Sequence, residues 1–167
     1  MALNPSSAHF RLLNAPDRPG QIVWLGLRPG RREPMLAVDG MDVDPRLGIV
    51  GDRYSRAGGA RQVTLIQSEL LAAIASHLGR SEVRPDELRR NVVTRGINLL
   101  ALKEKRFRLG AAVLETTGEC HPCSRMEEIL GVGGYNAARG LGGITARVAE
   151  GGFVGLSDQI VSLPPEA

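Results

Sequence analysis

The sequence of 167 residues is poor in several residue types, and each shortage narrows the function classes that remain. It contains two cysteines and three histidines, and all but two of its basic residues are arginine. Structural zinc needs four ligands, and besides His121 the chain offers only His9 and His77, neither at ligand spacing. A chain of this length buries about 70% of its unfolded surface, so the fold needs neither metal nor disulfide.

Long apolar runs and mixed basic and aromatic runs are also missing. No apolar run reaches transmembrane length, and the first seven residues lack the charged start and apolar centre of a secretion signal. Aromatic residues make up only 4% of the chain and the net charge is +3, which argues against a nucleic-acid partner. We therefore expect a cytoplasmic protein with reduced thiols and no membrane partner.

The apolar residues that are present lie mostly in short segments between glycine- and proline-rich turns. Ser68 is expected to cap a helix over 69–78, a helical turn is expected at 85–88, and 144–148 with 153–154 suggest a hairpin across Gly151 and Gly152. The pattern predicts a mainly β fold, a closed or nearly closed β-barrel with a few short inserted helices. The expected strands are 21–27, 35–38, 62–66, 91–94, 107–109, 112–116, 144–148, 153–154 and 159–162.

Both cysteines lie in one stretch, Cys120-His121-Pro122-Cys123, where an apolar strand is expected to run into a helix that ends at Gly131. Pro122 suits the first turn of that helix. Cys123 would then lie near a positive helix end and close to Arg125, which together favour thiolate over thiol. Cys123 is therefore a candidate nucleophile or soft metal ligand.

Other interpretations of the two cysteines stay open. They fit a pair of small, inert core residues, because free cysteine is among the most buried residue types. They also fit a dithiol that switches between reduced and disulfide forms. A thioredoxin-like domain is disfavoured, because its C-x-x-C follows an early strand, whereas Cys120 comes two-thirds along this chain.

Two further clusters are candidates for an anion pocket. Arg89, Arg90 and Asn91 stand at a predicted helix-to-strand junction and suit phosphate recognition, although arginines there also suit a solvated helix end. The glycine-rich segment 133–143 allows a ligand to approach the backbone closely, although glycine-rich segments are more often plain turns. The dinucleotide fingerprint fails at Asn136 and no Walker lysine exists, which excludes NAD binding and nucleotide hydrolysis. Asp52 and Arg53 are a candidate ion pair.

Six segments in order resemble a MOSC domain, the family named for the C-terminal domain of molybdenum-cofactor sulfurase. The resemblance runs from about Gly20 to Ile160, and we expect an N-terminal extension over 1–19, the domain over 20–162 and a tail over 163–167. The matching segments are Gly48-Ile49-Val50-Gly51-Asp52-Arg53-Tyr54, Arg61-Gln62-Val63-Thr64-Leu65-Ile66, Leu88-Arg89-Arg90-Asn91, Gly96-Ile97-Asn98-Leu99, the stretch from Cys120 to Glu128, and Gly142-Gly143-Ile144-Thr145-Ala146-Arg147-Val148.

The resemblance implies a β-barrel of the MOSC or pyruvate-kinase-barrel type and a pocket for the molybdenum cofactor, molybdopterin. In this chain Cys123 would be the sulfur carrier or molybdenum ligand, with Cys120 as a second candidate. The implied activity is sulfur transfer or, as in some relatives, reduction of N-hydroxylated compounds. We expect no pyridoxal-phosphate domain to mobilise sulfur and no ferredoxin-like segment to deliver electrons, so a separate desulfurase or reductase protein would act as partner. The candidate cofactor-binding residues are Arg61, Arg89, Arg90, Asn91, Arg125, Asn136 and Arg139.

Overall fold

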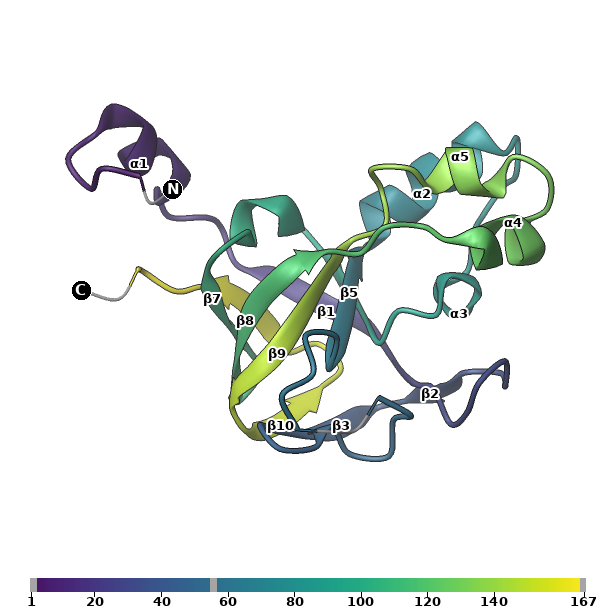
Figure 1. The fold of residues 1–167 in the computed structure, drawn as a ribbon, viewed down its shortest axis with the longest axis horizontal. Helices are drawn as coiled ribbons and strands as arrows, with labels where there is room; N and C mark the ends of the chain where they lie inside the picture. The colour runs from purple at the N-terminus through teal and green to yellow at the C-terminus, as the bar shows by residue number, and fades with distance from the viewer. Residues whose placement is uncertain (1–2, 55–56, 166–167) are drawn as a thin grey trace.

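The computed structural model describes residues 3–54 and 57–165, and within them seven strands close a β-barrel (Figure 1). The ring closes where β1 pairs with β11, with Gly20 opposite Ile160. Only β5 and β6 run parallel among the described pairs; the other neighbours are antiparallel. The predicted fold class is therefore confirmed. Around the barrel the strands are β1 (Gly20–Leu27), β11 (Gln159–Ser162), β7 (Arg106–Leu109), β8 (Ala112–Glu119), β9 (Ile144–Glu150), β5 (Val63–Gln67) and β6 (Val92–Arg95).

A small sheet lies at one end of the barrel, formed by β10 (Gly152–Gly155), β3 (Gly40–Asp44) and β4 (Gly48–Ile49). The strand β2 (Leu36–Val38) pairs antiparallel with the end of β1. The predicted hairpin across Gly151 and Gly152 is wrong, because β10 pairs with β3 instead of turning back on β9. A Cβ on Gly152 would lie 2.8 Å from the backbone of Ala111. The chain therefore passes closely over the β7–β8 turn and leaves the barrel wall there.

Four helices cover one side of the barrel (Figure 1): α2 (Ser68–His77), α3 (Pro85–Leu88), α4 (Ser124–Leu130) and α5 (Gly134–Ala138). Gln67, in extended conformation, is the N-cap of α2 and Ser68 is its first residue, so the predicted Ser68 cap is wrong by one position. The short helices α1 (Ala8–Leu13), η1 (Leu99–Leu102) and α5 were not predicted, because each has fewer than two turns of pattern.

Two apolar cores result from strand alternation. Leu65 and Val92 point into the barrel, whereas the next residues, Ile66 and Val93, point outward and pack under the helices. Met126 of α4 belongs to this second core. Residues of β5 and β6 thus contribute to both cores. The packing of the second core places α3 and α4 beside the strand ends where the cysteines and arginines lie.

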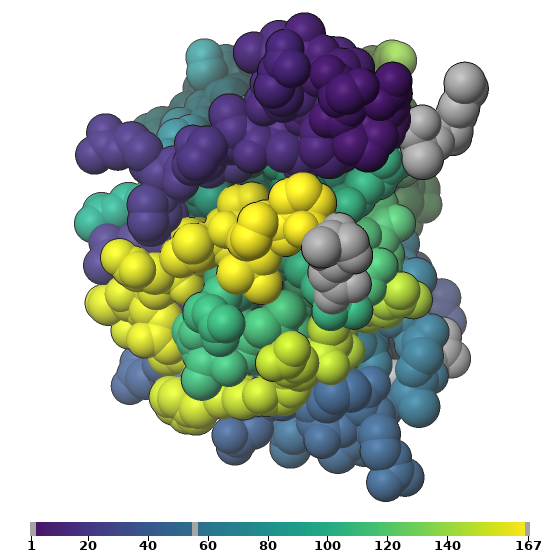
Figure 2. Space-filling view, turned by 90° about the vertical axis from the view of Figure 1, so that its left-hand side faces the viewer, coloured from purple at the N-terminus to yellow at the C-terminus, as the bar shows by residue number. Residues whose placement is uncertain are grey.

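The N-terminal segment around α1 (Ala8–Leu13) and the described residues after β11 lie side by side on another face (Figure 2). The helix α1 contributes no buried residue and is connected to the barrel by a hydrogen bond from Lys105 Nζ to the carbonyl oxygen of Leu13. In the described part of the chain, no helix has the length and apolar character required to cross a membrane.

Candidate functional site

A cavity of about 400 Å³ opens where four segments meet: the loop after β1, the segment between β4 and β5, the α3–β6 junction and the start of α4. No carboxylate is among the described residues that line it. The lining residues are Arg28, Arg31, Arg32, Arg53, Tyr54, Arg61, Leu88, Arg89, Arg90, Cys123, Arg125 and Met126. The cavity is therefore strongly cationic, and one thiol lies in its wall.

The two cysteines differ sharply in their surroundings. Cys123 is exposed and is the N-cap of α4, where its carbonyl oxygen accepts from the N–H of Met126 at 2.9 Å and its side chain makes no capping hydrogen bond. Cys120 is only 2% exposed and does not line the cavity. Pro122 precedes the N-cap, so it stands before α4 and not in its first turn as predicted. The reactive candidate is thus Cys123, whose sulfur is free to meet a ligand.

Arg90 is a buried cation in the cavity wall, 7% exposed. Its Nε donates to the carbonyl oxygen of Gly142 at 2.8 Å and its Nη1 to that of Leu88 at 2.6 Å. Burial lowers the pKa of Arg90 from its ordinary value, whereas the neighbouring Cys120 acts in the opposite direction. Because guanidinium remains protonated in proteins, the site keeps this charge.

Arg89 holds one side of the cavity in place. It ends α3 in the left-handed region with φ of 57°, and its guanidinium donates to the carbonyl oxygens of Gly30, at 3.2 Å, and Glu33. Burial, followed by the charge of Arg125, lowers the pKa of Arg89. Arg89 therefore anchors the loop after β1, which carries further cavity arginines.

Asn91 lies beneath the cavity and not in its lining. It is fully buried; its Oδ1 accepts from Arg28 at 2.8 Å and from Thr64 Oγ1 at 3.0 Å, and its Nδ2 donates to Gly26 and Asp52. Arg28 forms a buried ion pair with Asp52 at 2.9 Å. Asp52 therefore pairs with Arg28 and not with Arg53 as predicted. Asn91 supports this buried ion pair through hydrogen bonds to both of its members.

The remaining predicted residues fall into two groups. Arg61 and Arg125 line the cavity, and Arg125 also pairs with Glu128 at 3.0 Å. Asn136 and Arg139, at α5 and its end, are exposed, bond to each other at 3.5 Å and lie outside the cavity lining. The structure thus brings together Cys123 and four of the predicted arginines.

The glycine-rich segment contributes close packing in place of a ligand loop. A Cβ on Gly142 would come within 1.8 Å of the Cys120 carbonyl oxygen, and one on Gly143 within 1.9 Å of that of Leu65. Gly143 also has φ of +85°. The turn before β9 can therefore pass directly against the cysteine segment only because side chains are absent.

Sequence reasoning missed the arginines of two loops and a tyrosine beside them. Arg31 and Arg32 lie between the expected strands 21–27 and 35–38, in a segment for which no functional role is predicted, and Arg53 is predicted only as part of an ion pair. The Tyr54 ring lies 4.4 Å from the Arg28 guanidinium carbon and 4.8 Å from that of Arg53. The density of arginine in the turn after β1 was the available signal.

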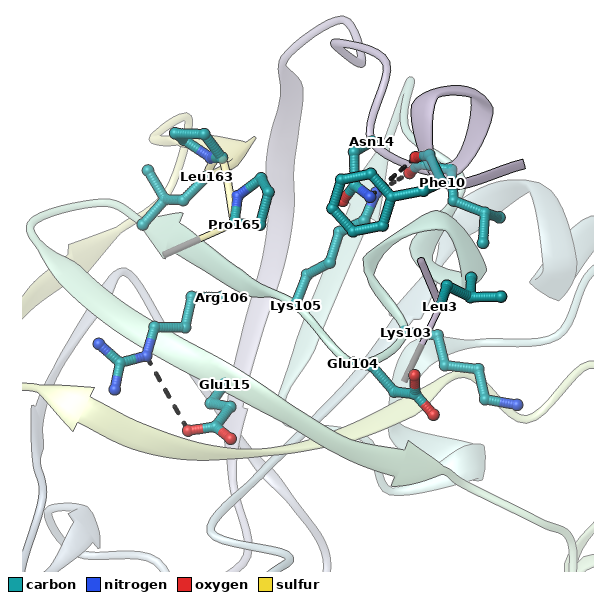
Figure 3. Close-up of a pocket in the computed structure, with 12 residues that line it drawn as sticks. Leu3, Phe10, Asn14, Lys103, Glu104, Lys105, Arg106, Glu115, Leu163 and Pro165 are labelled. Atoms are coloured by element: carbon teal, nitrogen blue, oxygen red, sulfur yellow. Dashed lines mark hydrogen bonds and ion pairs between the residues drawn. The ribbon is translucent and has the colours of Figure 1, made fainter. Parts of the chain in front are cut away.

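A second cavity, of about 430 Å³, lies between α1, the segment before β7 and the residues after β11 (Figure 3). Apolar side chains such as Phe10 and Leu163 face it, and both lysines of the chain, Lys103 and Lys105, line it. Neither cysteine lines this cavity. The arginine-lined cavity is therefore the candidate functional site.

Comparison with known proteins gives one matching family model and several similar solved structures. The family model described as MOSC domain matches residues 52–161. Among solved structures, the YuaD protein of Bacillus subtilis has a TM-score of 0.77 at 23% identity, over 89% of this chain and 98% of that one. YiiM of Escherichia coli has a TM-score of 0.67 at 17% identity, over 88% and 71%. At these identities the structures establish the fold alone. No match was found among curated proteins.

Proposed function

The chain belongs to the MOSC domain family, which is associated with molybdenum-cofactor binding or sulfurase-like function, and on that premise we propose that the arginine-lined cavity binds the molybdenum cofactor beside Cys123. The observation that supports this most is an exposed thiol in the wall of a cavity with eight arginines and no described lining carboxylate. Such a site suits a polyanionic ligand that also needs a soft sulfur ligand.

The residues present fit the chemistry of molybdopterin. Its phosphate needs cationic donors, and Arg61, Arg90 and Arg125 all line the cavity. Its metal centre accepts soft ligands, and the uncommitted sulfur of Cys123 is one. A volume of about 400 Å³ lies in the usual range for small-molecule pockets, about 300–1,000 Å³. When bound, the cofactor would supply a metal able to change oxidation state.

In the sulfur-carrier form of the proposal, Cys123 accepts a sulfane sulfur from a persulfide on a separate desulfurase protein. The thiolate attacks the terminal sulfur: Cys123–S⁻ + R–S–SH gives Cys123–S–S⁻ + R–SH. The S–S bond of the donor breaks as a new one forms, and no net oxidant or reductant is consumed. The surrounding guanidinium groups stabilise the anionic persulfide. We place this chemistry in the reducing cytoplasm, where a free thiol persists.

The carrier role is tested by incubating the protein with a low-molecular-weight persulfide and mapping the added sulfur by mass spectrometry. We expect one added sulfur atom on Cys123 in the wild type, and none on Cys120, the remaining cysteine, in a Cys123→Ser variant. A label that never appears on Cys123 would remove the carrier role.

The reductase form of the proposal is tested separately. Cofactor-loaded protein is mixed with an N-hydroxylated base and a flavin or iron-sulfur reductase, and the reduced base is measured. Cys123→Ala should abolish turnover, because the sulfur ligand is lost, while Arg139→Gln, outside the cavity lining, serves as the matched control. Unchanged turnover in Cys123→Ala would exclude the cysteine from the mechanism.

A second candidate function is a dithiol redox switch. It is favoured by the pairing of one exposed and one buried cysteine in a single C-x-x-C motif. Titration of free thiols at graded redox potentials distinguishes the two: a sharp two-electron transition near the cytosolic potential supports the switch, and its absence supports the carrier.

A further inference from the structure

Arg90 is held in the cavity wall by groups that leave its charge unneutralised. Its Nε and Nη1 donate to two backbone carbonyl oxygens, those of Gly142 and Leu88. Its Nη2 has no hydrogen-bond acceptor among residues 3–54 and 57–165. A carboxylate partner would cancel the positive charge, whereas carbonyl oxygens fix the geometry and leave the charge available to a ligand.

Arg61 is exposed, and its guanidinium group contacts the buried thiol of Cys120. Its Nη2 donates to Cys120 Sγ at 3.5 Å, and no ion pair of Arg61 occurs within the described ranges. Arg61 and Arg90 both line the cavity and are close enough that Arg61 lowers the pKa of Arg90. In the part of the chain that the structure describes, neither guanidinium group has a carboxylate partner, and both line one cavity near the buried sulfur of Cys120.

Cys120 is a rigid support for this contact. It is 2% exposed, its N–H donates to the Gly143 carbonyl oxygen at 2.8 Å, and the Gly142 backbone lies directly against its carbonyl group. Its sulfur is therefore held in one place and is shielded from reagents that reach the cavity. These properties suit an acceptor that orients a neighbour better than they suit a nucleophile.

We propose that Arg61 and Arg90 form an oxyanion clamp for a tetrahedral oxyanion, and that Cys120 is a positioning residue that orients Arg61 within it. The inference extends the proposed function, because the phosphate of a bound molybdenum cofactor is one source of that oxyanion and a free inorganic oxyanion is the other. The two cysteines then have different roles: Cys123 contacts the ligand, and Cys120 orients the guanidinium group of Arg61.

The clamp itself is tested by titrating inorganic phosphate into the protein by calorimetry at fixed low salt. Loss of one charge-assisted hydrogen bond should weaken phosphate binding about tenfold in Arg61→Gln and in Arg90→Gln. Arg139→Gln, which removes the same charge outside the cavity, should leave the affinity within about twofold. Equal weakening in all three variants would show a general charge effect and overturn the clamp. Because Arg90 is buried, its variant is interpreted only together with Arg61→Gln.

The positioning role is tested by comparing Cys120→Ala with Cys120→Ser. Serine keeps a hydrogen-bond acceptor for Arg61 and alanine does not, so the serine variant should retain phosphate affinity and the alanine variant should lose about as much as Arg61→Gln, about tenfold. In both variants Cys123 is the remaining thiol, and the ratio of its alkylation rates with anionic iodoacetate and neutral iodoacetamide reports the local positive charge. That ratio should fall in Cys120→Ala and be restored in Cys120→Ser. An unchanged ratio and affinity in Cys120→Ala would overturn the positioning role.

These outcomes separate the clamp from the proposed function. Phosphate binding that depends on Arg61 and Cys120, in protein that never carries molybdenum or pterin, supports a clamp for a free oxyanion and rejects the cofactor. Cofactor that is retained equally by the wild type, Arg61→Gln and Cys120→Ala rejects the clamp and leaves the cofactor site in place. If cofactor is retained by the wild type and lost from Arg61→Gln and Cys120→Ala, the phosphate of the cofactor is the occupant.

Discussion

Replacing Asn91 by alanine distinguishes a brace from a ligand contact. Asn91 is fully buried and joins Arg28, Asp52, Thr64 and Gly26 through five side-chain hydrogen bonds, at 2.8 to 3.2 Å. If Asn91 has a structural role through these hydrogen bonds, its replacement must lower the free energy of unfolding. If Asn91 instead serves a ligand, its loss must spare the fold and weaken binding.

The magnitude follows from the groups left without their partner. The Thr64 N–H and the Gly26 carbonyl group lose an uncharged partner, at about 1–3 kcal/mol each when buried, while Arg28 and Asp52 keep each other. Allowing for partial repair by water, we expect Asn91→Ala to lower the free energy of unfolding by about 3 kcal/mol. With a urea m-value of about 2 kcal/mol/M, the midpoint should fall by about 1.5 M.

The assay is urea unfolding followed by circular dichroism and by fluorescence of Trp24, the single tryptophan. Asn136→Ala is the matched control, because its side chain is exposed and its side-chain partner within the described ranges is Arg139, so its free energy of unfolding should stay within about 0.5 kcal/mol of the wild type. A wild-type midpoint in Asn91→Ala, together with lost phosphate binding, would refute the bracing role.

Two further predictions concern the loops that frame the site. The N–H groups of Tyr135 and then Gly133 lower the pKa of Glu127, so this carboxylate stabilises the fold above about pH 4.3 and the contribution disappears as pH falls through its folded pKa. Glu127→Gln should therefore lower the melting temperature at pH 7 and have little effect at pH 2.5, and an equal loss at both pH values would contradict the assignment. Gly143→Ala should reduce the urea midpoint far more than Gly140→Ala, because both have positive φ but only Gly143 meets backbone within 4 Å; equal losses would contradict the close-packing argument.

The barrel could be predicted from the sequence because its strands are short, apolar and separated by turn residues. A local sequence pattern does not show which strands pair with one another. The segment 153–154 was assigned correctly as a strand, yet it pairs with residues more than a hundred positions earlier, such as Met41 opposite Val154. The strand β3 was missed because its Asp42 and Asp44 suggest a loop.

The parts of the candidate site that lie within one short sequence motif could be predicted from the sequence. Cys123 and Arg125 follow from one motif, and the arginines beside α3 from another. The inward orientation of Asn91 depends on Arg28, 63 positions away, and on Asp52, 39 positions away, and no local pattern reveals such partners. The same holds for Cys120, whose contact with Arg61 spans 59 positions.

The central claim is that a cationic cavity with an exposed thiol holds the molybdenum cofactor. The most direct measurement is metal analysis together with pterin fluorescence on protein freshly purified from cells that make the cofactor. The account predicts molybdenum and pterin in equal amounts in the wild type, and reduced amounts of both in Cys123→Ala. Wild-type protein that contains neither molybdenum nor pterin would contradict it.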